Sequence, residues 1–278
     1  MGGAMAKNLV EAGFSLSVWN RSPEKAQPLL DAGASKGSSP QDVGTNCDVL
    51  LTCVTNDKAL EDVLLGENGA LTGQAKPSLV VDFSTVSSAT IKRIGVELAK
   101  NSISLIDAPV SGGDVGAQNG TLVIMAGGTE KNFKRAESIF NVLGKKNTHT
   151  GPLGSGQLTK CVNQLVVAVT ISAMTEGLLF AEDAGLNLET TLDIISGGAA
   201  GSWALENYAP RVLAGNFEPG FYARDMLKDL RIALEQASTQ STDTPVAKLV
   251  SSQFEELISK NPDVGNHALI QLYRGQHV

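Results

Sequence analysis

The sequence predicts an α/β domain over residues 1–153 and an all-α domain over residues 154–278, joined by one long helix. Two observations lead to this prediction. Up to about residue 153, short apolar runs alternate with helical stretches, which is typical of a parallel sheet covered by helices on both faces. After GPLGSGQ, helical patterns alone remain and no convincing strand follows.

The first domain opens with a helix over residues 1–13, because Met1, Met5 and Leu9 recur every fourth residue on one helical face. The runs VLLTCV and LVVDF are nearly continuous in apolar residues, as strands buried on both faces should be. We expect strands at residues 16–20, 48–54, 78–83, 104–108 and 121–126. We expect helices at residues 23–32, 58–65, 88–100 and 130–143.

The second domain begins with the long helix, which we place at residues 157–184 with Gly185 as its stop. Its apolar stretch VVAVTISAM is too short for a membrane span and predicts a buried core helix. Further helices are expected at residues 188–196, 202–214, 224–239 and 244–260.

Composition excludes several functional classes. The 278 residues are 42% hydrophobic and 18% charged, which is enough apolar material for a large core. The net charge of −7 argues against nucleic acid as the main partner. The three cysteines and three histidines show no ligand spacing, so we expect no metal site, no disulfide framework and a cytoplasmic protein. No basic region precedes an apolar run at the start, so no signal peptide or membrane association is expected.

The residues Asn20-Arg21-Ser22 follow the strand LSVW. In a doubly wound sheet the end of the second strand lies beside the adenosine ribose of a bound dinucleotide. An acidic residue there would hold the 2′-hydroxyl of NAD, whereas Arg21, with Asn20 and Ser22 as donors, favours the 2′-phosphate of NADP. Taken alone, an arginine after a strand is more often a solvated turn residue.

Two longer motifs are far more specific: DAPVSGGDVGAQNGTLVIMAGG at residues 107–128 and GSGQLTKCVNQ at residues 154–164. Together with MG..MAKNL, NRS..K, GAAGSWALEN and PGFYARDMLKDLRIAL, they resemble, in order over nearly the whole chain, the β-hydroxyacid dehydrogenase family. Its members include 3-hydroxyisobutyrate dehydrogenases, tartronate semialdehyde reductases and glyoxylate/succinic semialdehyde reductases. The resemblance implies a Rossmann-type first domain and NADP(H)-dependent interconversion of a small β-hydroxyacid and its semialdehyde or a related 2-oxo or aldehyde acid.

The segment Ser111-Gly112-Gly113 follows a strand end. Glycines there let a carboxylate approach backbone N–H groups, and the Ser111 hydroxyl is a further donor. Without the resemblance an ordinary glycine turn would be favoured. With it, the segment is expected to hold the carboxylate of the substrate.

Lys160 lies near the start of the mostly apolar long helix. A lone helix lysine is normally a surface charge, but burial and the positive end of the helix dipole would lower the pKa of this one. A lysine of that kind can exchange a proton near neutral pH. Asn163 lies three residues on, on the same face. By resemblance Lys160 is the general acid/base and Asn163 assists it.

The resemblance also implies a set of cofactor contacts. Thr85 matches a position near the cofactor, and Lys228 matches a lysine that reaches the cofactor from the helical domain. Read directly, these two would be a helix-capping threonine and a surface lysine. Trp203 is interpreted as a core or interface aromatic. The complete expected set of cofactor-binding residues is Met1, Gly2, Asn20, Arg21, Ser22, Val54, Thr55, Thr85 and Lys228.

The chain departs from the family pattern at four places. Gln164 replaces a usual second asparagine, Val54-Thr55 replaces Leu-Pro, and Asn266-His267 replaces an Asp-x-Ser-like pattern. The first strand and the first two glycines of the phosphate loop are missing, and Met1-Gly2 matches the loop's end. We therefore expect an N-terminally truncated reading in which Met1 is an internal methionine.

Three further readings follow from the same residues. A non-catalytic NADP-binding or oligomerisation module would explain the missing strand, but such a protein would be expected to lose Lys160. An imine reductase shares the fold, but retention of Lys160 and of the carboxylate segment weighs against it. A 6-phosphogluconate dehydrogenase shares the architecture, but this chain is too short for the larger helical domain of that enzyme.

The apolar long helix and the resemblance together favour a homodimer or homotetramer.

Overall fold

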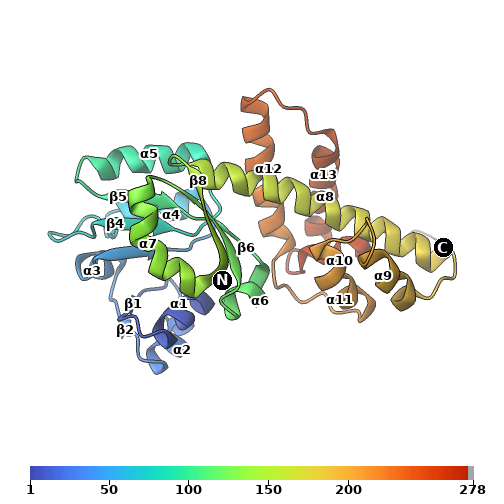
Figure 1. The fold of residues 1–278 in the computed structure, drawn as a ribbon, viewed down its shortest axis with the longest axis horizontal. Coiled ribbons are helices and arrows are strands. Elements are labelled where there is room, and N and C mark those ends of the chain that lie inside the picture. The colour runs from blue at the N-terminus through green and yellow to red at the C-terminus, as the bar shows by residue number, and fades with distance from the viewer. Residues whose placement is uncertain (275–278) are drawn as a thin grey trace. The chain divides into compact units, whose positions relative to one another are not determined.

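A computed structural model describes residues 1–274 and divides the chain into two compact units, Met1–Lys160 and Cys161–Val278 (Figure 1). The long helix α8 (Ser155–Asp183) begins in the first unit and continues into the second. The predicted fold class, an α/β Rossmann-type domain followed by a helical domain, is confirmed.

The five predicted strands and five predicted helices of the first unit, the opening helix included, are all present, with ends that shift by a few residues. The strands are β1 (Ser17–Val18), β2 (Ser35–Lys36), β3 (Val49–Thr52), β4 (Leu79–Asp82), β5 (Ser104–Asp107), β6 (Val110–Ser111), β7 (Leu122–Gly127) and β8 (Gly144–Gly151). The helices are α1 (Gly2–Glu11), η1 (Pro23–Ala26), α2 (Gln27–Asp31), α3 (Pro40–Thr45), α4 (Asp57–Leu65), α5 (Ser88–Ala99), α6 (Gly113–Gln118) and α7 (Glu130–Leu143). The sequence missed the short elements β2, β6, α3 and α6, and it missed β8 because GKKNTHTG has no apolar run.

The main sheet has the order β3-β4-β5-β7-β6. Strand β8 is not in this sequence of neighbours, but it also pairs with β7. Strands β3, β4 and β5 are parallel, as predicted. The expectation of a wholly parallel sheet is wrong, because β7 runs antiparallel to β5 and β6. The connection from β6 to β7 is residues 112–121, shorter than a parallel crossover needs.

Apolar residues of β4 alternate between two cores. Leu79 and Val81 join one cluster with α1, α6 and α7, whereas Val80 joins a second cluster with α4 and α5. Because successive side chains of a strand point to opposite faces, both faces of the sheet are covered by helices. This is the two-sided burial that the runs VLLTCV and LVVDF predict.

Strands β1 and β2 form a separate two-stranded parallel sheet, and neither pairs with β3. The described strands of the first unit therefore lie in two separate sheets.

The start of α8 packs tightly against the carboxyl ends of β5 and β7. The Asp107 carboxylate, at the end of β5, accepts hydrogen bonds from the backbone N–H groups of Gly154 at 2.7 Å and Gln157 at 2.8 Å. A Cβ on Gly156 would lie 2.4 Å from the carbonyl oxygen of Met125, so only glycine fits there. The GSGQ motif is thus explained by a helix N-terminus that is seated on the edge of the sheet.

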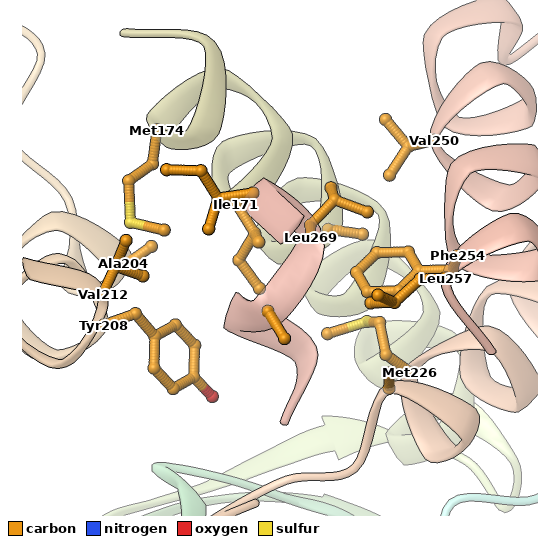
Figure 2. Close-up of a cluster of buried hydrophobic side chains, with 14 of the residues drawn as sticks. Ile171, Met174, Ala204, Tyr208, Val212, Met226, Val250, Phe254, Leu257 and Leu269 are labelled. Atoms are coloured by element: carbon orange, nitrogen blue, oxygen red, sulfur yellow. The ribbon is translucent and has the colours of Figure 1, made fainter. Parts of the chain in front are cut away.

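All named secondary-structure elements in the described residues of the second unit are helices. Their ranges follow the predicted ones closely. Its remaining helices are α9 (Leu188–Ser196), α10 (Trp203–Asn207), α11 (Ala209–Leu213), α12 (Ala223–Thr239), α13 (Pro245–Lys260) and η2 (Asn266–Leu272). The single helix expected at residues 202–214 is two helices, because Pro210 cannot donate a backbone hydrogen bond into a preceding turn. Figure 2 shows the shared core, which includes Phe254, Met226, Ile171 and Tyr208.

The unusual pair Asn266-His267 has a structural explanation in this core. His267 stacks on Tyr208 with ring centroids 5.1 Å apart, and its Nε2 lies 2.9 Å from the carbonyl oxygen of Asn216. Burial lowers the pKa of His267, which favours the neutral ring. Asn266 is fully buried and donates to the Tyr208 hydroxyl.

Among the described residues, α8 alone is long and apolar enough to cross a membrane, and 44% of its most apolar window is buried. The core helices of many proteins pass the same test, so this is weak evidence for a span. The stretch at residues 166–174 was expected to be a buried core helix. It is buried on one face, where Ala168, Ile171 and Met174 join the core, whereas Val166 is exposed.

The seating of α8 predicts the effect of one added methyl group. Gly156→Ala should destabilise the protein by about 1–3 kcal/mol, the usual cost of overpacking, because backbone oxygens meet the new Cβ. Gly177, on the same helix, has nothing within 4 Å of an added Cβ. Gly177→Ala should instead stabilise it by about 0.5–1 kcal/mol, through lower chain entropy in the unfolded state.

Thermal unfolding followed by circular dichroism measures both variants. Equal melting temperatures for the Gly156 and Gly177 variants would contradict the close approach of α8 to the sheet.

Candidate active site

The N-terminus of α1 lies at the carboxyl end of β3. A Cβ on Gly2 would lie 3.2 Å from the Cβ of Cys53, the residue that follows β3. The first turn of α1 holds no acidic residue, and no side chain caps it. Backbone N–H groups at such a helix start favour an anion, so Met1 and Gly2 fit a dinucleotide pyrophosphate.

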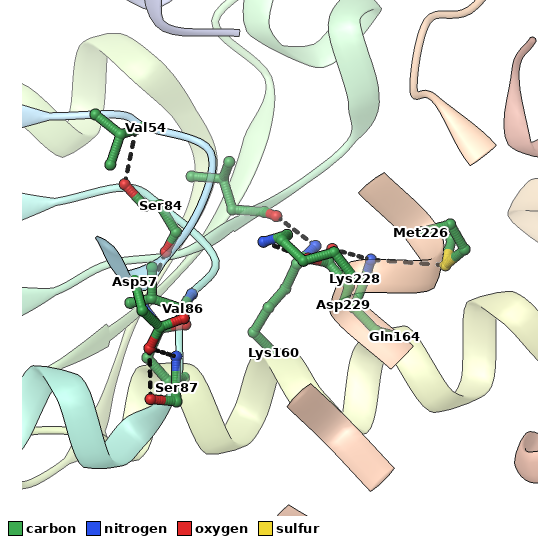
Figure 3. A network of polar contacts seen from close by, with 12 residues as sticks. Val54, Asp57, Ser84, Val86, Ser87, Lys160, Gln164, Met226, Lys228 and Asp229 are labelled. Carbon is green, nitrogen blue, oxygen red and sulfur yellow. Dashed lines mark hydrogen bonds and ion pairs between the residues drawn. The ribbon is translucent and has the colours of Figure 1, made fainter. Parts of the chain in front are cut away.

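The segment after β4 is held by buried hydrogen bonds (Figure 3). The Asp82 carboxylate accepts from the hydroxyls of Thr52 at 2.7 Å and Ser84 at 2.6 Å. The Ser84 hydroxyl in turn accepts from the backbone N–H of Val54 at 2.8 Å. These bonds join the ends of β3 and β4, and so place Val54 and Thr85 on adjacent segments of one sheet edge.

Thr85 does not cap a helix. The N-cap of α5 is Ser87, whose hydroxyl accepts from the backbone N–H of Thr90. The side-chain amide of Gln157 on α8 bonds to the residues before and after Thr85. It donates to the carbonyl oxygen of Ser84 at 2.8 Å and accepts from the backbone N–H of Val86 at 3.2 Å. Thr85 is therefore held in place by its neighbours' contacts with α8.

Two buried carboxyl groups lie side by side under this edge. Asp82 and Asp107 are paired residues of β4 and β5. Burial raises the pKa of Asp82 to about 7 and that of Asp107 to about 6, against hydrogen bonds that lower both. Neither residue was predicted as part of the site. The available signal was an aspartate at the end of each buried strand, in VVDF and LIDA.

The residues expected to meet the ribose lie just beyond β1. Asn20 and Arg21 are exposed, and the Asn20 side chain accepts from the backbone N–H of Ser22 at 3.2 Å. That bond shapes the turn and leaves the Arg21 guanidinium at the surface. Thr55 is also exposed, beyond the end of β3.

Lys160 and the Ser111 segment are brought together. The Lys160 ammonium donates to the carbonyl oxygen of Val110, the residue before Ser111, at 2.8 Å. Lys160 is only 7% exposed. Gly112 and Gly113 have φ angles of +130° and +67°, a backbone path that side chains disfavour, and α6 begins at Gly113.

The remaining predicted residues belong to the second unit, where a polar chain links them (Figure 3). Asn163 donates to the side-chain oxygen of Gln164 at 2.8 Å, and Gln164 donates to Asp229 at 2.6 Å. Lys228 forms an ion pair with Asp229 at 2.9 Å. The sequence singled out Asn163 and Lys228 but gave no role to Gln164 or Asp229.

Other side chains that the sequence analysis considered lie apart from this chemistry. Trp203 is 44% exposed and packs edge-on against Tyr208. Within residues 1–274 the structure contains no cluster of three or more potential metal ligands, and Cys47, Cys53 and Cys161 are in the thiol form. His277, one of the three histidines, falls outside the described residues.

Two family models cover the chain. The NAD-binding domain of 6-phosphogluconate dehydrogenase matches residues 1–151. The NAD-binding model of NADP-dependent 3-hydroxyisobutyrate dehydrogenase matches residues 154–273.

Individual proteins agree with these models. The chain is 36% identical over 272 residues to a 2-hydroxy-3-oxopropionate reductase of Escherichia coli, covering 98% of this chain and 93% of the relative. It is 38% identical to a probable mitochondrial 3-hydroxyisobutyrate dehydrogenase-like protein of Arabidopsis thaliana, covering 97% and 81%. A crystal structure of 3-hydroxyisobutyrate dehydrogenase from Salmonella typhimurium superposes with a TM-score of 0.89 at 27% identity, covering 98% and 95%.

Sequence, fold and motif order thus agree from the first helix to the last. The chain belongs to the β-hydroxyacid dehydrogenase family of NAD(P)-dependent oxidoreductases that act on CH–OH groups.

Proposed function

We propose that this protein transfers hydride reversibly between NADP(H) and a small acid, with a β-hydroxyacid on the alcohol side and a semialdehyde or related 2-oxo or aldehyde acid on the carbonyl side. The observation that carries the proposal is the buried Lys160, whose ammonium lies 2.8 Å from the carbonyl oxygen that immediately precedes Ser111. A proton donor and a carboxylate-binding segment are what such a substrate requires at its two ends.

Ser111, Gly112 and Gly113 hold the substrate carboxylate. The positive φ angles of the two glycines let the backbone approach an anion closely, and the start of α6 adds a positive helix end to their N–H groups. Fixing the carboxylate orients the reacting carbon, which is the positioning part of catalysis.

The cofactor set comprises Met1 and Gly2 at the start of α1, Val54, Thr55 and Thr85 along the sheet edge, Asn20, Arg21 and Ser22 beyond β1, and Lys228 of the helical unit. The exposed Arg21, with no acidic residue in Asn20-Arg21-Ser22, favours the 2′-phosphate of NADP over the ribose hydroxyl of NAD.

The reduced nicotinamide supplies the hydride that the carbonyl carbon receives. Lys160 provides the proton: its Nζ ammonium gives one hydrogen to the carbonyl oxygen as that oxygen becomes a hydroxyl, and the neutral amine takes it back in the oxidation direction. The hydrogen bond to Val110 holds Nζ beside the segment that orients the substrate. Asn163, three residues along α8, assists Lys160.

The protein acts as a homodimer or homotetramer in the cytoplasm. Val162, Val166 and Phe180 are more than 60% exposed on α8, and Leu249 on α13 is 60% exposed. An open groove lined by residues of α8 and of the start of α13 runs beside Val166. An apolar face of this kind is typical of subunit contacts. The thiol form of the three cysteines is consistent with a reducing compartment.

Turnover of a panel of short semialdehydes, glyoxylate and hydroxyacids, each with NADPH and NADH, tests the function. We expect at least one semialdehyde or glyoxylate-like acid to be reduced, with the higher kcat/KM for NADPH. A higher value with NADH would overturn the cofactor assignment. Tight NADPH binding without turnover of any acid would support the non-catalytic alternative.

Lys160→Met should lower kcat by about 10²–10⁴-fold with saturating cofactor, the usual contribution of a general acid/base. Lys100, exposed on the sheet domain and paired with Glu97, supplies a matched control, and Lys100→Met should leave kcat unchanged. Wild-type turnover in the Lys160 variant would remove it from the mechanism.

Light scattering coupled to gel filtration should give two or four times the mass of one chain. The double variant Val166→Asp/Leu249→Asp should shift the protein toward one chain, because charges would enter the apolar face. Val96, 62% exposed on α5, supplies the control, and Val96→Asp should leave the mass unchanged. A monomeric wild-type protein would contradict the assembly.

A further inference from the structure

We propose that Gln164, anchored by the buried carboxylate of Asp229, is a positioning residue that fixes the orientation of the Asn163 amide. The proposal rests on the proposed function, in which Asn163 assists Lys160. It assigns work to two residues of the second unit that make no part of the expected site.

The two residues are buried and closely bonded. Gln164 is 3% exposed and Asp229 is 3% exposed. The Gln164 Nε2 lies 2.6 Å from Asp229 Oδ2, whereas its Oε1 lies 2.8 Å from Asn163 Nδ2. The other Asp229 oxygen, Oδ1, lies 2.9 Å from the Lys228 ammonium. One amide thus joins a carboxylate on α12 to an asparagine on α8. Figure 3 shows Gln164 beside Asp229 and Lys228.

The direction of this chain of bonds follows from charge. An ionised carboxylate only accepts hydrogen bonds, so the group that Gln164 turns toward Asp229 must be its NH₂. The Gln164 oxygen then faces Asn163 and accepts a hydrogen bond from the Asn163 NH₂ group. The Asn163 oxygen lies at the other end of the same amide and points away from Gln164. The ion pair with Lys228 holds the second carboxylate oxygen of Asp229 and so helps to fix the orientation of this carboxylate.

Side-chain length explains why glutamine stands at this position. Adjacent residues of a helix do not face each other, so a bond between the side chains of Asn163 and Gln164 needs a long, flexible partner. The same glutamine must also reach α12. Asparagine is about 1.5 Å shorter, one carbon–carbon bond, and could not make both contacts from the same backbone position.

The consequence is that Asn163 is held before any ligand arrives. Residues whose amides are fixed in advance do not lose rotamer freedom in the reaction, which benefits the chemical step rather than cofactor binding. Asp229 contacts the cofactor residue Lys228 as well, whereas Gln164 bonds to Asn163, to Asp229 and to the Met226 sulfur. A substitution at Gln164 therefore removes the bond to Asn163 and keeps both partners of the Lys228–Asp229 ion pair.

A double-mutant cycle with Gln164→Met and Asn163→Ala tests the proposal. Methionine keeps the length and burial of glutamine but makes no amide hydrogen bonds. We expect Gln164→Met to lower kcat about tenfold, with the KM for NADPH within twofold of the wild type, and to have no further effect in the Asn163→Ala background. A tenfold change corresponds to about 1.4 kcal/mol, the scale of one hydrogen bond. An unchanged kcat, or an equal loss in both backgrounds, would overturn the proposal.

Gln164→Asn is the second variant, because it keeps the amide but shortens it. Its kcat should fall as in Gln164→Met, although its chemistry is conserved. Glu255→Gln supplies the control for a lost carboxylate partner of α12, since Glu255 pairs with Arg231 at the surface, and its kinetics should match the wild type. Wild-type kcat in Gln164→Asn would show that reach is not the reason for glutamine.

The side-chain amide resonances of Gln164 provide a readout that needs no turnover. In a ¹H–¹⁵N spectrum of the wild-type protein, the pair lost in Gln164→Met should move in Asp229→Asn and in Asn163→Ala but not in Glu255→Gln. Absence of either shift would overturn the proposal even if the enzyme is active. Presence of both in a protein without turnover would uphold the bonding while the proposed function fails.

Discussion

The seating of α8 on the carboxyl edge of the sheet is the constraint on which the candidate site depends. Asp107 accepts from two N–H groups of the helix start, and Gly156 allows the backbone to come within contact of β5 and β7. Gln157 and Lys160 both lie within the first two turns of α8. The position of the helix start therefore determines where their side chains point. A buried carboxylate that satisfies a helix N-terminus stabilises the positive end of the helix dipole.

Much of the fold follows from apolar patterning, and the exceptions have physical reasons. Strands β3 and β4 were predicted from the apolar runs VLLTCV and LVVDF, which suit burial on both faces. The observed ends of α7 and α9 match the predicted ranges, and Thr129 and Asn187 cap these two helices. Strand β8 was not predicted because its sequence is polar and has no apolar run, although its backbone pairs with β7. The direction of β7 depends on the length of a connection, which a strand's own composition does not encode.

The candidate site divides in the same way. Lys160 and Ser111 carry chemical groups that a sequence motif can reveal. The contact of Lys160 with Val110 spans 50 positions and that of Gln164 with Asp229 spans 65, so neither is visible in local periodicity. Gln157 was passed over because an amide on a helix is unremarkable until its partners at Ser84 and Val86 are known. Sequence motifs can thus identify the reactive residues, but they do not predict the long-range polar contacts that hold these residues in place.

The central claim is that hydride passes directly between NADPH and the carbonyl carbon of a small acid. The most direct measurement is the mass of the hydroxyacid formed when the protein reduces a semialdehyde or glyoxylate-like acid with NADPH that carries deuterium at C4 of the nicotinamide. The account predicts a product one mass unit heavier than that from unlabelled NADPH, for one of the two C4 epimers. A product free of label with both epimers, or no product with any acid, would contradict it.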